Sequence, residues 1–246
     1  MADPKPTRHD ERLDLSDSIV VNLNELTAHP ENYSFFTFRP NLKKLVLSGA
    51  EDSKHISILW YTASSSTVGL HYHAMTESVY TIDGIQRDAK GAYPTGSLYF
   101  NPPGSGHEIS SSTGFFLLAY AAPADFINTN LIRRYTPVRL DVTSSKVETT
   151  YPFRAIQDGV QIYKVPLDST GGISSQLVKS VSSKRYAYSG NYLLVLNGRC
   201  HINGTSFNAG MLIVAASIEA QSYIISAAEG IPCLLLGLSF GLGEEL

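Results

Sequence analysis

Short apolar runs, separated by turn-forming residues, make up most of the chain from Ile19 onward. Their side chains are largely β-branched or aromatic, and Gly, Pro, Asn, Asp and Ser stand between the runs. Many short strands at even spacing are typical of an antiparallel sandwich or barrel, so an all-β fold is predicted. Helical periodicity is nearly absent, and residues 124–134 are the best candidate for a short helix or linker turn. The predicted strands of the first half are residues 19–23, 44–47, 56–61, 69–73, 78–82, 97–100 and 115–121.

The strand pattern returns in the second half, and a shift of 114 residues aligns the two halves. Gly84 then falls on Gly198 and Gly96 falls on Gly210, so the hairpin between the glycines keeps its length. Two alignable copies of one supersecondary unit predict two barrels of one kind. The predicted strands of the second half are residues 192–196, 210–215, 222–225 and 232–238.

These strands divide the chain into three parts. Residues 1–18 are polar, charged and proline-bearing, so we expect a mobile arm there. A first barrel is expected over residues 19–140 and a second barrel over residues 141–246. The polar stretch 141–150 fits a link between the two barrels.

Four side chains of the first half are suited to binding a metal. His71 and His73 lie on a predicted strand, where alternate side chains share a face, so both imidazoles point the same way. Glu77 follows where that strand ends, and His107 comes after a Pro-Pro-Gly-Ser-Gly turn that folds the chain back. Three imidazoles and one carboxylate predict a site for one first-row divalent cation. The predicted metal ligands are therefore His71, His73, Glu77 and His107.

These residues carry a resemblance to the cupin superfamily. Two positions depart from the family pattern, Ser65 in place of Gly and Ser111 in place of Asn, and neither is a metal ligand. The spacing is also similar to the cupin domain of ChrR-type anti-sigma factors and to acetylacetone-cleaving dioxygenases. The resemblance implies a bicupin, with two tandem barrels of the double-stranded β-helix or jelly-roll kind. The motif H-x-H-x3-E-x6-G is matched at His71, His73, Glu77 and Gly84, and the motif G-x5-P-x-G-x2-H at Gly96, Pro102, Gly104 and His107.

The second copy has lost the ligand set. Arg185, which aligns with His71, cannot be deprotonated at ordinary pH to coordinate a cation. We therefore expect a metal-free second barrel that packs against the first and covers sheet surface. A ligand held by Arg185 and Gln221 is a weaker alternative. The 114-residue shift pairs His71 with Arg185, His73 with Ala187, Glu77 with Asn191 and His107 with Gln221.

Strand geometry sends alternate side chains into a barrel, so a mostly apolar pocket is expected beside the metal. Four ligands on an octahedral ion leave two neighbouring positions open, which oxygen-activating Fe(II) enzymes require. Glu77 is also the candidate catalytic residue, as a loose ligand that doubles as a base. The predicted pocket residues are Trp60, Val79, Thr81 and Tyr99.

Three functions are compatible with this site. The first is a metal-dependent oxygenase of the cupin class, most simply a dioxygenase that acts on a small diketone or phenol. The second is a ChrR-like sensory or regulatory module in which a closed tetrahedral Zn(II) does no chemistry. The third is a redox-neutral isomerase, cyclase or lyase that uses the metal as a Lewis acid. We favour Fe(II), while Zn(II), Mn(II) and Ni(II) stay open.

Composition limits the partners. The formal net charge of -3 leaves no basic excess for a nucleic-acid backbone, and no polybasic stretch suits a membrane surface. The chain has neither an apolar run of spanning length nor the apolar core of a signal peptide, so a cytoplasmic protein is expected. Its two cysteines, Cys200 and Cys233, lie in or beside apolar runs and are expected to be buried thiols. The expected partners are a small-molecule substrate and, by analogy with edge-paired barrels, a second copy in a homodimer.

Overall fold

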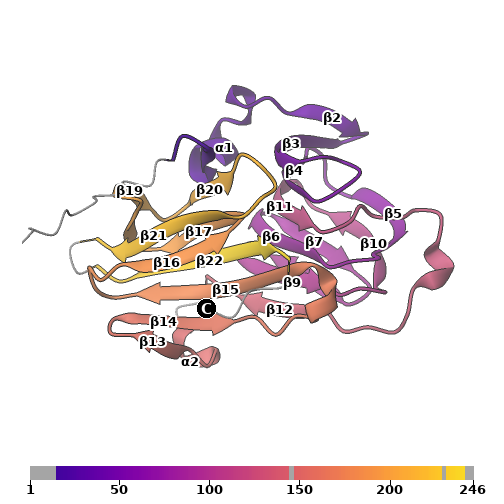
Figure 1. Ribbon diagram of the computed structural model, residues 1–246. Helices are drawn as coiled ribbons and strands as arrows, with labels where there is room; N and C mark the ends of the chain where they lie inside the picture. The colour runs from indigo at the N-terminus through magenta and orange to yellow at the C-terminus, as the bar shows by residue number, and fades with distance from the viewer. Residues whose placement is uncertain (1–14, 144–146, 229–230, 242–246) are drawn as a thin grey trace, which may run out of the picture.

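Two tandem jelly-roll barrels, each made of a seven-stranded and a four-stranded antiparallel sheet, form the computed structural model (Figure 1). The structure describes residues 15–143, 147–228 and 231–241. The predicted all-β fold and the two predicted jelly-roll barrels are confirmed. Residues 1–14 of the predicted arm and residues 144–146 of the predicted link lie outside the described residues.

The first barrel holds the predicted metal ligands. Its seven-stranded sheet has the order β12-β9-β6-β11-β4-β3-β2, and its four-stranded sheet has the order β5-β10-β7-β8. The large sheet contains β12 (Val138–Asp141), β9 (Ser97–Asn101), β6 (Glu77–Asp83), β11 (Gly114–Tyr120), β4 (His55–Tyr61), β3 (Leu42–Gly49) and β2 (Phe36–Arg39). The small sheet contains β5 (Ser66–Tyr72), β10 (Gly106–Ser111), β7 (Ile85–Asp88) and β8 (Gly91–Pro94).

The second barrel repeats this topology, with the orders β1-β20-β17-β22-β15-β14-β13 and β16-β21-β18-β19. The strands β7, β8 and β9 reappear 114 residues later as β18, β19 and β20 with the same lengths, which confirms the repeat. The large sheet contains β1 (Ser18–Asn22), β20 (Met211–Ala215), β17 (Tyr192–Asn197), β22 (Cys233–Phe240), β15 (Ile173–Ser180), β14 (Val160–Lys164) and β13 (Arg154–Gln157). The small sheet contains β16 (Tyr186–Gly190), β21 (Gln221–Ala227), β18 (Arg199–Ile202) and β19 (Thr205–Asn208).

Helices are short. The helix α1 (Leu23–Ala28) begins at Asn22, whose side-chain oxygen accepts hydrogen bonds from the amides of Asn24 and Glu25. In the predicted helix or turn at residues 124–134 the structure has only a single 3₁₀ turn. Among the described helices, none has the length and hydropathy to cross a membrane. The others are α2 (Val147–Thr150), η1 (Pro30–Asn32), η2 (Thr129–Leu131) and η3 (Ser169–Gly171).

Each barrel lends a strand to the other. The strand β1 precedes the first barrel in sequence but pairs with β20 of the second, from Ser18↔Ala215 to Asn22↔Met211. The strand β12 follows the first barrel and pairs with its β9, before the chain enters the second barrel. The proposed division at residue 140 stays a prediction, but residues 19–22, assigned to the first barrel, complete the sheet of the second.

The two large sheets face each other across a shared apolar core. Alternation along β4 explains how one strand serves two cores, because Ile58 points to the shared core while Leu59 and Tyr61 point into the first barrel. On the opposite sheet Leu194 and Leu236 face the shared core. A separate cluster fills each barrel. Burial between the sheets therefore joins the barrels in addition to the strand exchange.

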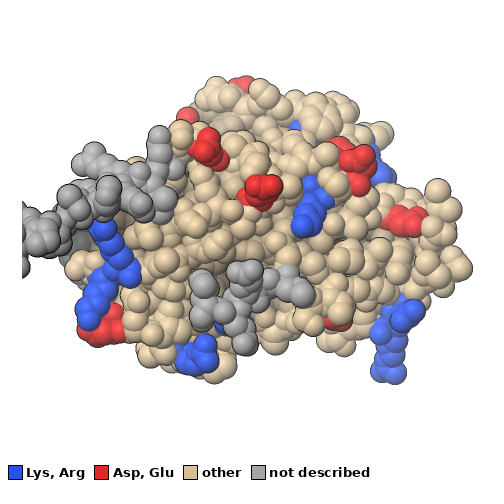
Figure 2. Space-filling model, in the orientation of Figure 1, with Lys and Arg blue, Asp and Glu red and all other residues tan. Residues whose placement is uncertain are grey.

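Charged side chains are sparse on the face of the molecule drawn in Figure 2. Basic and acidic groups stand singly or in mixed groups over both barrels, and no basic cluster gathers there. This agrees with the small net charge of the sequence, -3.

Candidate metal centre

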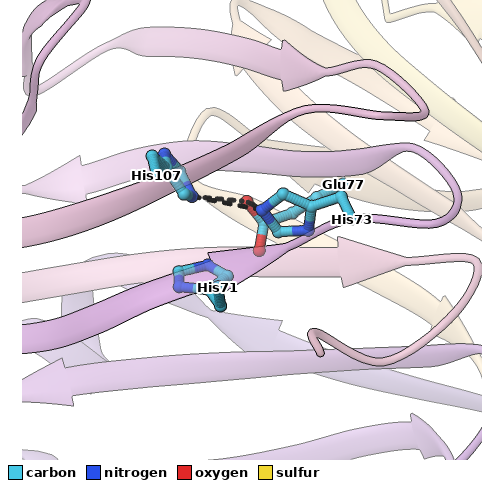
Figure 3. A group of neighbouring side chains, drawn as sticks. All are labelled: His71, His73, Glu77 and His107. Atoms are coloured by element: carbon cyan, nitrogen blue, oxygen red, sulfur yellow. Dashed lines mark hydrogen bonds and ion pairs between the residues drawn. The ribbon is translucent and has the colours of Figure 1, made fainter. Parts of the chain in front are cut away.

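The four predicted metal ligands converge in the first barrel (Figure 3). One potential ligand atom from each side chain lies within 4.8 Å of the other three, and all four side chains are buried. Nε2 of His73 is 3.2 Å from Nε2 of His107. Oε2 of Glu77 is 3.5 Å from each of these two nitrogens. Among the described residues, this is the one group of three or more His, Cys, Asp or Glu with such spacing.

Backbone pairing brings these side chains together. His71 and His107 are direct cross-strand partners on β5 and β10, so their side chains share the inner face of the small sheet. His73 lies just beyond β5, and its backbone N–H and C=O bond to Ser105 and Gly104 in the turn before β10. Gly104 has φ +84°, the left-handed conformation that glycine adopts without strain. The predicted fold-back of the Pro-Pro-Gly-Ser-Gly turn is therefore what closes the site.

An acidic residue orients the imidazole of His107. Its Nδ1–H donates to Oδ2 of Asp88 over 3.0 Å, which leaves Nε2 free to bind a metal. Asp88 is held in turn by the hydroxyl of Tyr93, at 3.1 and 3.2 Å from its two oxygens. The backbone amides of Lys90 and Gly91 also donate to it, over 2.7 and 3.0 Å. The carboxylate thus sits at the β7–β8 turn with a fixed orientation.

Two further contacts set the remaining ligands. The carbonyl of Gly69 accepts a hydrogen bond from Nδ1 of His71 over 2.8 Å, so Nε2 of His71 is also left for a metal. Nδ2 of Asn101 donates to Oε2 of Glu77 over 3.0 Å, from the directly opposite position on β9. Each of these contacts fixes a ring or a carboxylate before any metal binds.

The electrostatics of the cluster favour a cation. Burial lowers the pKa of His73 to about 4, and burial also lowers the pKa of His71, so both rings are neutral near pH 7. Burial alone would raise the pKa of Glu77, but the neighbouring imidazoles hold it well below its usual range. Burial alone would lower the pKa of His107, but hydrogen bonds to Asp88 and Glu77 raise it to about 9. Only one of the four side chains therefore carries a proton that a metal must displace.

These residues fit a first-row divalent ion. Three imidazole nitrogens and one carboxylate oxygen form the donor set, and hydrogen bonds at Nδ1 of His71 and His107 leave Nε2 of each ring for the ion. Such a set suits iron, manganese, nickel or zinc, and the donors alone do not select among them.

The predicted pocket residues separate into two groups. Val79 and Tyr99 belong to the apolar cluster inside the first barrel, and Thr81, on the same face of β6, donates to the carbonyl of Tyr93 over 3.2 Å. Trp60 lies elsewhere. It points into the shared core between the large sheets, where its ring stacks on Phe115 with centroids 5.5 Å apart. The structure therefore places three of these residues inside the barrel and Trp60 outside it.

In the second barrel, aromatic side chains stand where the imidazoles stand in the first. The cross-strand pair Ser111↔Gln86 of the first barrel corresponds to the pair Ala227↔Cys200 of the second. Cys200 follows Gln86 by 114 residues, but Ala227 follows Ser111 by 116, so β21 aligns with β10 at a shift that is two residues longer. The cross-strand pair His71↔His107 then corresponds to Tyr188↔Tyr223, and not to Arg185 and Gln221. The predicted alignment of those two residues with the ligands is wrong, because the shift changes along the chain.

The phenol rings fill the space that a metal site would need. A Cβ built at Gly190 or Gly237 would lie 2.3 and 2.6 Å from atoms of Tyr188, so both positions need glycine to admit the ring. Asn191, which does align with Glu77, is buried and bonded to backbone, since its Nδ2 donates to Ile218 over 2.7 Å. The described residues of the second barrel form no cluster of three or more His, Cys, Asp or Glu. That this barrel binds no metal stays a prediction.

Several residues of the site gave no sequence signal. Asp88 reads as part of an ordinary D-x-x-G turn, and Asn101 as a strand end. Phe126 covers the ring of His71 with centroids 5.1 Å apart, and the guanidinium of Arg39 lies 4.4 Å from the centroid of Phe126. Both come from other parts of the chain, so local spacing could not reveal them. His55, which the charged residues before it suggest is exposed, is fully buried against Tyr120.

Comparison with known proteins agrees with this geometry. Residues 23–124 match the family described as ChrR Cupin-like domain. No curated protein matches the chain significantly.

Solved structures with the same fold span both barrels. Lactobacillus farciminis oxalate decarboxylase, in a formate complex, is 12% identical over 91% of this chain and 86% of that one, with a TM-score of 0.52. A mutant of Bacillus subtilis oxalate decarboxylase is 12% identical over 100% of this chain and 86% of that one, with a TM-score of 0.52. A second mutant of the Bacillus enzyme is 14% identical over 92% and 78%, with a TM-score of 0.50. At this identity the likeness shows the fold alone.

Proposed function

Because residues 23–124 match the ChrR Cupin-like domain and the chain folds as two jelly-roll barrels, we propose that it is a metal-dependent dioxygenase that acts on a small diketone or phenol. The observation that carries the proposal is the buried set of three histidines and one glutamate inside an apolar barrel. When bound, Fe(II) would supply Lewis acidity and oxygen activation. The proposal includes Fe(II) as the working metal, ahead of Mn(II), Ni(II) and Zn(II).

The protein residues have distinct roles in this proposal. The imidazoles and Glu77 hold the ion, and Asp88 and Asn101 keep His107 and Glu77 in place. The apolar wall, which includes Val79 and Tyr99, excludes water from the reacting groups. Because its pKa lies far below neutral, Glu77 is ionised at working pH, which suits a metal ligand. In its proposed second role, Glu77 would be a loose ligand that doubles as a base.

Packing of the fold argues against a purely structural metal. Eleven strands of the first barrel's two sheets are already joined by backbone hydrogen bonds. Clusters on both faces of the large sheet supply a core that does not include the ligands. Small zinc domains, in contrast, depend on the ion because they lack such a core. A metal in this barrel is therefore free to serve chemistry.

Oxygen uptake tests the proposal. Protein loaded anaerobically with Fe(II) is mixed with a panel of β-diketones and phenols, and oxygen consumption is followed after air is admitted. We expect uptake with at least one substrate and none with the His73→Ala variant. Absence of uptake across the panel contradicts a dioxygenase, and turnover of a substrate without oxygen identifies a redox-neutral lyase or isomerase instead.

The match to the ChrR Cupin-like family supports a second candidate, a Zn(II)-binding sensory module. It requires a closed four-coordinate ion with no exchangeable position. Metal analysis and X-ray absorption of protein purified without added metal separate the two. Iron with five or six ligands supports the enzyme, and zinc with four protein ligands supports the sensor.

A further inference from the structure

A cationic side chain lies one aromatic ring away from the metal ligands. Arg39 ends β2, and its guanidinium carbon is 4.4 Å from the centroid of Phe126. The ring of Phe126 in turn lies 5.1 Å from the ring of His71. The guanidinium is therefore no farther from the imidazole than the sum of these two distances. An arginine at the edge of a metal site can act on whatever the metal binds.

Backbone hydrogen bonds hold the segment that carries Phe126, the ring on which Arg39 stacks. Asp125 exchanges two backbone hydrogen bonds with Tyr72 on β5, of 2.8 and 2.9 Å. Its carboxylate accepts from the amides of Ile127 and Asn128 over 2.8 and 3.0 Å, which fixes the turn on the far side of Phe126. These bonds fix the backbone on both sides of Phe126, whose ring lies beside the ring of His71 and carries the stacked guanidinium.

Arg39 has no acidic partner in the described part of the chain. Its guanidinium makes no hydrogen bond or ion pair with a described residue, and its ring contacts are with Phe126 and Phe38. The neighbouring cation Lys44 differs, because its Nζ is 2.7 Å from a carboxylate oxygen of Glu51. A half-buried arginine whose fork of donors is unused is equipped to bind a planar anion in two-point fashion.

We propose that Arg39 is a specificity-determining residue that binds the carboxylate of an organic anion while the other end of that anion coordinates the metal. The inference rests on the proposed function in one respect, since it needs an open position on the metal. It names the substrate class more closely, as a diketone or phenol that also carries a carboxylate. Phe126 acts as the positioning residue, because the guanidinium stacks on its ring beside His71.

Chelators that differ only in charge test this. The probes are 3,4-dihydroxybenzoate, 3,4-dihydroxyphenylacetate and 3-(3,4-dihydroxyphenyl)propionate, each compared with its own amide. The catechol end binds Fe(III)-loaded protein with a visible charge-transfer band, and the three spacers cover a range of reach. Dissociation constants from that band are a binding measurement and need no turnover.

We expect at least one acid to bind about tenfold more tightly than its amide, the gain typical of a charge-assisted two-point contact. Arg39→Gln removes this preference and leaves amide binding and metal content unchanged. Arg39→Lys, which keeps the charge but not the fork, retains only part of the preference. The matched control is Lys43→Gln, because Lys43 also lies over an aromatic ring, 4.6 Å from Trp60, which points to the shared core. That variant keeps the full preference.

Three results overturn the inference. The first is equal binding of acids and amides to the unaltered protein. The second is an Arg39→Gln variant that binds acids and amides more weakly to the same degree. The third is a protein that binds no catechol, because the metal has no open position. The last result also removes the proposed enzyme. An acid preference that depends on Arg39, in a protein that consumes no oxygen, upholds the anion site and refutes only the dioxygenase.

Discussion

Metal binding to this protein is expected to release about one proton at neutral pH. Among the four ligands, His107 is the one whose pKa is raised, to about 9, while the pKa values of His71, His73 and Glu77 are lowered. A metal can bind Nε2 of His107 only after its proton leaves. At pH 7 the ring is about 99% protonated by this value, so release is close to stoichiometric.

The same value sets the pH dependence of metal affinity. When the pH is two units below the pKa of a group, removing its proton costs about 3 kcal/mol, which lowers metal affinity about a hundredfold. Apparent affinity should therefore rise about tenfold per pH unit from pH 6 to 8 and level off above about pH 9. Isothermal titration in two buffers of different ionisation enthalpy measures the protons released, and competition with a chelator measures the affinity.

The Asp88→Asn variant tests the cause. Asparagine can still accept the Nδ1–H of His107, so the ring keeps its place, but the charge that holds the proton is gone. We expect the pKa of His107 to fall by about one to two units and proton release at pH 8 to drop below about half. Asp83→Asn, at the exposed end of β6, serves as the control and should match the unaltered protein. Negligible proton release from the unaltered protein at pH 7 would refute the reasoning.

Three further predictions concern stability. Burial lowers the pKa of His55 to about 4, so the imidazole binds a proton more readily in the unfolded chain than in the folded one. The free energy of unfolding should therefore fall by about 2 kcal/mol from pH 7 to pH 5. Urea titrations of a His55→Leu variant should show a flatter pH dependence. Gly84→Ala places a Cβ 2.5 Å from the carbonyl oxygen of Thr113, whereas the Cβ of Gly204→Ala meets nothing within 4 Å at a similar positive φ. In thermal melts the Gly84→Ala variant should therefore lose more stability than the Gly204→Ala variant. Leu236→Ala empties part of the shared core and should lower the free energy of unfolding by about 2–5 kcal/mol, and a change below 1 kcal/mol would contradict its burial there.

Regular spacing made the fold and the ligand set predictable. Strand periodicity and the repeated glycine interval at Gly84 and Gly96 depend on local geometry, which sequence records directly. The H-x-H pair and the turn before His107 likewise place their side chains through neighbouring strands. The structure brings those ligands together as that spacing predicts.

The sequence does not indicate which face of a fully buried strand points into the barrel. Side chains on both faces of β4 are mostly apolar, so their alternation does not indicate which face points into the barrel. The prediction that Trp60 lines the pocket is wrong for this reason. His55 begins the same strand and is buried although charged residues precede it. Contacts such as Arg39 with Phe126 join distant segments, and no local pattern encodes them.

The exchange of edge strands gives the second barrel a role without a metal. The strand β12 covers β9 at one edge of the first barrel's large sheet, and its chain continues directly into the second barrel. The ligand Glu77 lies on β6, which pairs with β9, and Asn101 of β9 holds its carboxylate. Any loosening of the second barrel that pulls β12 away exposes the edge of the strand that carries Asn101. Since the rings of Tyr188 and Tyr223 fill the second barrel where the first holds imidazoles, that copy can be packed tightly with no space kept for a ligand. The second barrel thereby supports the strand pair on which the geometry of Glu77 depends.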